Sequence, residues 1–221
     1  QVMQQQAGKL LALAAGFGGV KTIEMGLEQG LFAELAKHPD GLDAATLASR
    51  TELDPAYVAV WCRCAYAAEL LDATADGAYR LAPAMGTLLL DRDAPAYMGA
   101  LFGVLPQPEF FDAFAQRLRS GERIWWDQFR PEFIHRAAAT GRGFYTRLIP
   151  AGLQQIPGLP ERLERGGRVL ELACGAGHGL ARMAHAYPQC TLVGVDGDAY
   201  SLELAAKTLE HDGLASRVQL R

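Results

Sequence analysis

The stretch that most constrains the fold is Gly167–Asp196, GRVLELACGAGHGLARMAHAYPQCTLVGVD. It begins with a short apolar run, Arg168–Leu172, of the kind found in parallel strands buried on both faces. A glycine-rich loop follows at 173–177, then a helical pattern at 178–187 and a second apolar run at 191–195. Strand, helix and strand in this order predict a right-handed β-α-β crossover within a parallel sheet.

The loop and the acid after the second strand predict a nucleotide-cofactor site. Glycines at 175, 177 and 179 allow a tight backbone turn and leave room for a ligand to approach. Asp196 ends the second strand, where a carboxylate can accept hydrogen bonds from both hydroxyls of a ribose. The pattern therefore predicts a cofactor with an unphosphorylated ribose, which NAD and S-adenosylmethionine (SAM) both carry.

Two residues favour SAM over NAD. The dinucleotide fingerprint G-x-G-x-x-G, read from Gly175, has Leu180 in place of its third glycine. Glu171 stands near the end of the first strand, just before the loop. A carboxylate there would repel a pyrophosphate, but it suits the ammonium and sulfonium groups of SAM.

These motifs resemble a known family. VLELACGAGHG followed by LVGVD resembles the first two motifs of the class I SAM-dependent methyltransferases. The preceding 166 residues resemble the winged-helix dimerisation region of small-molecule methyltransferases, and bacterial enzymes of the type-12 kind are a closer match. The resemblance covers nearly the whole chain.

The resemblance implies roles for single residues. Glu171 would hold the methionine amino end of SAM, the loop would pack on the methionine and ribose, and Asp196 would bind the ribose hydroxyls. The family commonly has Asp at position 171 and Gly at position 173, where this chain has Glu171 and Ala173. The expected cofactor-binding residues are Glu171, Ala173, Gly175, Gly177, Asp196 and Gly197; no catalytic residue and no metal ligand is identified.

The amino-terminal half has the layout of a winged helix. Residues 3–30 are predicted to form one long helix or a helix pair, either buried in the core or at a dimer interface. Asp43 and Asp54 are predicted N-caps of two further helices, and an Asp-Gly turn at 76–77 predicts a hairpin.

Charge argues against DNA as the partner of this half. Residues 1–100 hold seven lysines or arginines against twelve acids, and such a surface is repelled by phosphates. We therefore expect a dimerisation or substrate-lid role for the winged helix.

A connector rich in aromatic residues follows the winged helix. Trp125, Trp126, Phe129 and Phe133 are expected to join two domains through hydrophobic packing; lining a pocket for a flat ligand is the alternative. His135 is expected to be an exposed helix residue. The predicted domains are a winged-helix domain at 1–92, a helical connector or lid at 93–160 and a partial Rossmann-like SAM-binding domain at 161–221.

Composition fits a globular protein, with 50% apolar residues and a net charge of −4. No apolar run reaches the roughly 18–20 residues of a membrane span, so no membrane association is expected. The four cysteines form no C-x-x-C pair, which favours free thiols and a cytoplasmic location over a zinc site or disulfides.

The cofactor domain is expected to be incomplete. By the family resemblance the sheet has seven strands, and this chain supplies about three. We expect a mainly α winged-helix domain followed by the first part of an α/β Rossmann-like parallel sheet, in a fragment that binds SAM weakly and turns over nothing alone.

The predicted function is SAM-dependent methyl transfer to a small-molecule acceptor by a homodimer that associates through the amino-terminal domain. One alternative is a regulatory or binding protein that keeps the SAM fold without catalysis. The other is an NAD-dependent oxidoreductase, which Glu171 and Leu180 disfavour.

Overall fold

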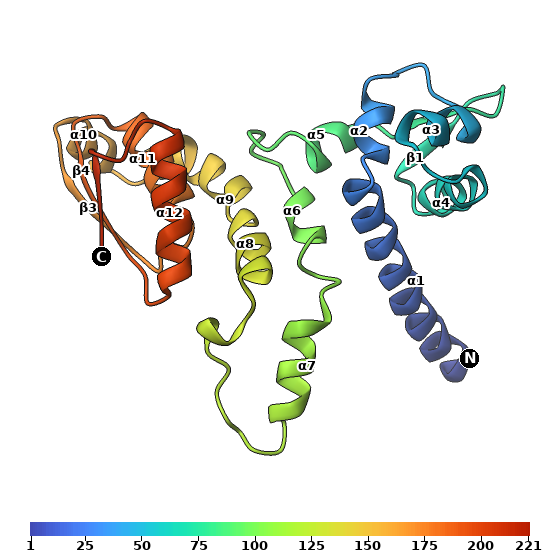
Figure 1. Cartoon of the computed structure of the whole chain (residues 1–221), viewed down its shortest axis with the longest axis horizontal. Coiled ribbons are helices and arrows are strands. Elements are labelled where there is room, and N and C mark those ends of the chain that lie inside the picture. The colour runs from blue at the N-terminus through green and yellow to red at the C-terminus, as the bar shows by residue number, and fades with distance from the viewer. The chain divides into compact units, whose positions relative to one another are not determined.

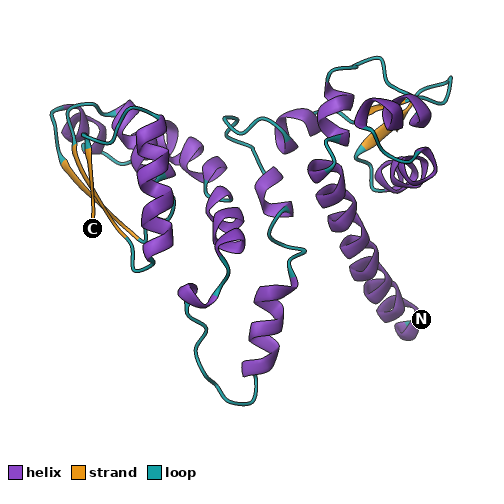
Figure 2. Ribbon diagram, in the orientation of Figure 1, coloured by secondary structure: helices purple, strands orange, loops and turns teal.

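The computed structural model describes residues 1–221 and divides into two compact units, Gln1–Asp91 and Arg92–Arg221. Both units are rich in helix, and the parallel strands belong to the second (Figures 1 and 2). The segment 93–160 therefore belongs to the same compact unit as the sheet.

The first unit consists of helices followed by a two-stranded hairpin. The Asp43 carboxylate accepts from the Thr46 amide at 2.9 Å, and the Asp54 carboxylate accepts from the Ala56 amide at 2.9 Å. Both aspartates are therefore N-caps, as predicted. The winged-helix assignment stays a prediction. The elements are α1 Val2–Glu28, α2 Leu31–Ala36, α3 Ala44–Thr51, α4 Pro55–Ala67, β1 Leu71–Ala73, β2 Tyr79–Leu81 and α5 Met85–Leu89.

Helix α1 is one continuous helix that packs on the first unit only near its carboxyl end. Ile23 and Gly26 are buried there, and the Trp61 indole of α4 donates to the Thr22 carbonyl at 2.9 Å. The earlier turns lie open to solvent, with Leu10 69% and Phe17 64% exposed. A buried core helix is thus wrong for most of this segment within the first unit, because no other element of that unit covers it.

By length and composition alone, α1 is apolar enough to cross a membrane, although polar residues interrupt its apolar runs. About a fifth of its most apolar window (22%) is buried. A buried core helix or a signal sequence can meet the same criteria of length and composition, so one such helix is weak evidence for a membrane span.

The second unit places helices before and between three parallel strands in the order β3-β4-β5. The β-α-β crossover is present as predicted. The elements are α6 Gly99–Phe102, α7 Pro108–Arg117, η1 Trp126–Gln128, α8 Pro131–Ala139, α9 Arg142–Arg147, η2 Leu148–Gly152, η3 Leu153–Gln155, α10 Leu159–Glu164, β3 Arg168–Leu172, α11 His178–Ala186, β4 Thr191–Val195, α12 Ala199–His211 and β5 Val218–Leu220.

One face of this sheet carries the core. Helix α11 packs on β4, α12 packs on β5, and both helices pack on each other. Leu170 and Leu172 of β3 point to the opposite face and are 59% and 70% exposed. The expectation that this strand is buried on both faces is therefore wrong here, because helices cover one face only.

Candidate functional site

The loop after β3 adopts left-handed backbone at three positions. Ala173, Gly175 and Gly177 have φ of 54°, 53° and 73°. Glycine adopts this region freely, whereas an alanine there costs about 1 kcal/mol. Ala173, where the family usually has glycine, therefore has two effects. It strains the backbone of the loop, and it adds a methyl group on the side where a ligand would approach.

The other glycines serve close packing. A Cβ on Gly177 would lie 3.1 Å from the Cβ of Ala205 in α12. A Cβ on Gly179 would lie 2.5 Å from Oε1 of Glu171 and 2.6 Å from Cε1 of Tyr145. Gly177 thus lets α12 pack closely against the loop, and Gly179 leaves room for the side chains of Glu171 and Tyr145.

Asp196 ties the two strand ends together. Its carboxylate accepts from the Gly175 amide at 2.8 Å and from the Asp198 amide at 3.0 Å. Asp198 is buried and caps α12, accepting from the Ser201 amide at 2.7 Å. Both strand-end loops are therefore held in place by aspartates.

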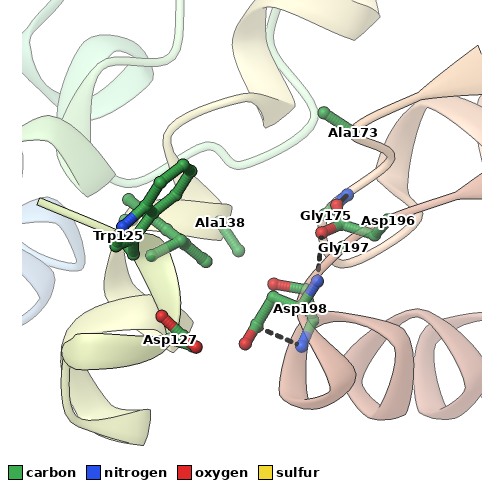
Figure 3. A pocket seen from close by; sticks show the side chains of 11 residues that line it. Trp125, Asp127, Ala138, Ala173, Gly175, Asp196, Gly197 and Asp198 are labelled. Atoms are coloured by element: carbon green, nitrogen blue, oxygen red, sulfur yellow. Dashed lines mark hydrogen bonds between the residues drawn. The ribbon is translucent and has the colours of Figure 1, made fainter. Parts of the chain in front are cut away.

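A pocket of about 620 Å³ opens beside these loops. Figure 3 shows Trp125, Asp127 and Ala138 on one wall, facing the strand-end loops on the other. Its lining includes three aspartates and no lysine or arginine. The full lining is Trp125, Trp126, Asp127, Ala137, Ala138, Ala173, Gly175, Asp196, Gly197, Asp198 and Ser201.

Four of the six predicted cofactor residues line this pocket: Ala173, Gly175, Asp196 and Gly197. Gly177 is buried against α12 instead. The Glu171 carboxylate accepts a hydrogen bond from the Tyr145 hydroxyl of α9 at 2.5 Å. Burial raises the pKa of Glu171, and it raises the pKa of Tyr145 as well, with the neighbouring carboxylate adding to the second shift.

The side chain of His178, at the start of α11, faces α9. Its Nε2 accepts a long hydrogen bond from Nε of Arg142 at 3.4 Å. Burial, followed by the charge of Arg142, lowers the pKa of His178 to about 4. The imidazole is therefore neutral near pH 7, as an acceptor of this bond must be.

The aromatic residues of the connector divide into two pairs, one that packs in the core of the second unit and one that lines the pocket. Phe129 and Phe133 are buried and stacked, with ring centroids 4.7 Å apart. They pack with Ala176 of the loop and Leu204 of α12, within the second unit. Trp125 and Trp126 stay exposed and line the pocket, while His135 is exposed as expected.

Sequence reasoning did not assign roles to four residues of this region: Arg142, Tyr145, His178 and Asp198. The cap role of Asp198 could have been found, because an aspartate immediately before a helical run is a capping signal. The contacts of Arg142 and Tyr145 carry no local signal, since they depend on how α9 packs against β3 and α11.

Comparison with known proteins identifies similar domains. Residues 169–221 match the family model described as a methyltransferase domain. Ribosomal RNA small subunit methyltransferase C of Stutzerimonas stutzeri (strain A1501) is 39% identical over 66 residues, which make up 30% of this chain and 18% of that protein.

Solved structures resemble the chain over nearly its whole length. PigF with SAH superposes with a TM-score of 0.72 at 21% identity, covering 96% of this chain and 65% of that one. Human N-acetylserotonin methyltransferase in complex with SAM gives 0.69 at 16% identity, covering 98% and 65%. The chain thus spans just under two thirds of the length of these structures, and the likeness establishes the fold.

Proposed function

Because this chain has the class I methyltransferase fold, we propose that it acts in SAM-dependent methyl transfer to a small-molecule acceptor. The observation that carries the proposal is the charge of the pocket beside the glycine loop. Asp127, Asp196 and Asp198 line it, and no basic side chain does. Such a lining suits a sulfonium cation and disfavours the pyrophosphate of NAD.

The residues present fit SAM in size and chemistry. A pocket of about 620 Å³ lies within the roughly 300–1,000 Å³ usual for ligand sites. Asp196 lies at the pocket wall, where an acceptor for ribose hydroxyls is needed, and keeps lone pairs beyond its two backbone bonds. A Cβ added to Gly175 would meet no atom within 4 Å, so the backbone there is open to a ligand.

The cofactor would supply an electrophilic methyl group on a sulfonium, which an acceptor nucleophile displaces. The chain's contribution is alignment and exclusion of water. The Asp196 carboxylate and the loop orient the ribose side, and Trp125 faces them from the opposite wall. Trp126 adds to the apolar lining of the pocket. No described residue is assigned as a general base.

A small-molecule acceptor is favoured over a nucleic acid. Among the structurally similar proteins are human N-acetylserotonin methyltransferase and the mitomycin 7-O-methyltransferase MmcR, whose names give small acceptors. The ribosomal RNA enzyme matches only 30% of this chain. The acidic balance of residues 1–100 also disfavours a nucleic-acid partner.

The test is calorimetric titration of the full-length protein with S-adenosylhomocysteine (SAH) and, separately, with NAD⁺. We expect saturable binding of SAH at one site per chain and none of NAD⁺. Binding of NAD⁺ without SAH would refute the proposal. Transfer of labelled methyl groups from SAM to a panel of small phenols and amines would separate an enzyme from a non-catalytic SAM-binding protein.

We further propose that the protein is a cytoplasmic homodimer that associates through α1. All four cysteines are free, which suits a reducing compartment. Leu10, Leu13 and Phe17 of α1 recur at spacings of three and four and are 64–72% exposed. A second copy of the same helix would cover this apolar stripe.

A further inference from the structure

Helix α7 is joined to the start of α8, beside one wall of the pocket, by polar and aromatic contacts. The Glu109 carboxylate accepts from the backbone amide of Arg130 at 2.9 Å and from its Nη2 at 2.9 Å. These hydrogen bonds lower the pKa of Glu109, so the carboxylate is charged at neutral pH. The Phe110 ring stacks on the buried ring of Phe129, with centroids 6.1 Å apart. The two residues that precede α8 are therefore fixed to α7.

One residue earlier in the chain, Gln128 extends this contact to the pocket wall. Its Oε1 accepts from Nη2 of Arg117 in α7 at 3.0 Å and from the backbone amide of Trp125 at 3.4 Å. The Gln128 amide also donates to the Trp125 carbonyl at 3.2 Å. A single residue thus links the Arg117 guanidinium to the backbone of Trp125, which lines the pocket.

Trp125 depends on this link more than its neighbour does. The Trp126 ring lies 5.8 Å from the Phe129 ring and 6.0 Å from the Phe133 ring, between centroids, and so has support from the core. Trp125 belongs to no such ring pair and is 58% exposed. Figure 3 shows it facing the strand-end loops across the pocket. The turn held by Gln128 is therefore what fixes this wall.

The environment of Arg117 is costly for a residue of purely structural role. The side chain is half-buried, and Nη1 donates to the Ala113 carbonyl at 3.3 Å. Its Nε is buried without a hydrogen-bond partner. A buried donor without an acceptor costs free energy, so stability alone does not account for an arginine at this place. Its bond to Gln128 gives it a second role.

We propose that Arg117 is a positioning residue for the pocket, which holds the Trp125 wall through Gln128. This inference rests on the proposed function, because it concerns the pocket assigned there to SAM. It goes further by giving a role in ligand binding to α7, none of whose residues lines the pocket. A ligand that fills the space between the two walls contacts both, so its affinity depends on where Trp125 is held.

The test is a double-mutant cycle on SAH affinity in the full-length protein, measured by calorimetry. Arg117→Gln should weaken SAH binding about 3- to 10-fold, as expected for the loss of one hydrogen bond that orients the wall. In a Trp125→Ala background the same substitution should change the affinity less than about twofold, because Arg117 acts through the Trp125 ring. A merely structural role would weaken binding equally in both backgrounds.

Two variants and one spectroscopic signal complete the experiment. Arg119→Gln, at an exposed arginine two positions after Arg117, is the matched control and should leave SAH affinity unchanged. Arg117→Lys keeps a donor for Gln128 and should recover part of the lost affinity. The SAH-induced change in tryptophan emission that is absent from Trp125→Ala belongs to Trp125, and it should shrink in Arg117→Gln at saturating SAH.

The outcomes separate this inference from the proposed function. No SAH binding by the wild-type protein would refute both. If the wild-type protein binds SAH, an unchanged affinity in Arg117→Gln, or equal losses in the two backgrounds, would overturn the inference alone. Should Arg117→Gln fail to fold, Gln128→Ala, at an exposed side chain, removes the same link and should give the same loss with the same dependence on Trp125.

Discussion

At the scale of single residues, the carboxylate of Asp196 is both a binding group and a structural one. The family resemblance implies contacts with a ribose, and the structure shows that the same side chain accepts two backbone amides. Removing it leaves the amides of Gly175 and Asp198 without their acceptor. Substitution of Asp196 is therefore expected to affect the stability of the fold as well as cofactor binding.

We expect Asp196→Ala to weaken SAH binding by about 1–3 kcal/mol, and to lower the free energy of unfolding by about 1–2 kcal/mol through the orphaned amides. Calorimetry and urea unfolding measure the two effects. Asp127→Ala is the control for the unfolding measurement, because Asp127 is an exposed aspartate of the same pocket and its removal orphans no backbone amide. Unchanged SAH affinity in Asp196→Ala would contradict the ribose role.

His178 should make stability depend on pH. Its pKa is about 4 in the fold, against an ordinary value of 6.5, and Arg142, Asp212, His135 and Arg182 also act on it. Between these values the unfolded chain binds a proton that the folded chain does not, so stability falls as pH drops from 6.5 to 4.

We expect His178→Gln to remove about 2–3 kcal/mol of this pH dependence. Urea unfolding at about pH 4.5 and at about pH 7.5 measures the free energy of unfolding near the two ends of the His178 titration range. The difference between the two values is then compared between variants. His211→Gln, at an exposed histidine at the end of α12 that is not among the groups acting on His178, should leave the pH dependence as in the wild type. The same slope in His178→Gln would show that other groups cause it.

At the scale of elements, the docking of α1 depends on one glycine. A Cβ on Gly26 would overlap Cε2 of Phe32 and lie 2.5 Å from Cζ2 of Trp61. These two rings meet edge to face, with centroids 5.1 Å apart. Gly16, on the same helix, has nothing within 4 Å of its Cβ position.

Gly26→Ala should therefore destabilise the first unit by about 1–3 kcal/mol through overpacking. Gly16→Ala should stabilise it by about 0.5–1 kcal/mol, because alanine favours helix and meets no neighbour. Thermal unfolding followed by circular dichroism compares the pair. Equal effects of the two substitutions would show that Gly26 does not set the packing distance.

The elements that sequence predicted best are those fixed by local chemistry. β3 and β4 have the bounds of the two apolar runs, and Asp43 and Asp54 cap helices because a free amide needs an acceptor wherever the helix starts. Contacts between elements that are distant in the sequence could not be predicted from local patterns. The pairing of Glu171 with Tyr145 needs α9 to lie beside the end of β3, and the exposure of Leu170 depends on which face of the sheet the helices cover.

At the scale of the whole molecule, α1 presents apolar surface that nothing in the first unit covers. Besides Leu10, Leu13 and Phe17, Met3 and Leu11 are 85% and 70% exposed. Exposed apolar stripes of this kind mark an interface.

We expect the protein to elute as a dimer in light-scattering chromatography at micromolar concentration, and Phe17→Glu to give a monomer, because a charge cannot be buried unpaired in a helix interface. Tyr57→Glu is the control, since Tyr57 is a similarly exposed aromatic residue of α4. A wild-type monomer, or a dimer in Phe17→Glu, would refute association through α1. If the wild-type protein instead floats with lipid vesicles and Phe17→Glu does not, the stripe binds a membrane, and the length and composition of α1 would explain why.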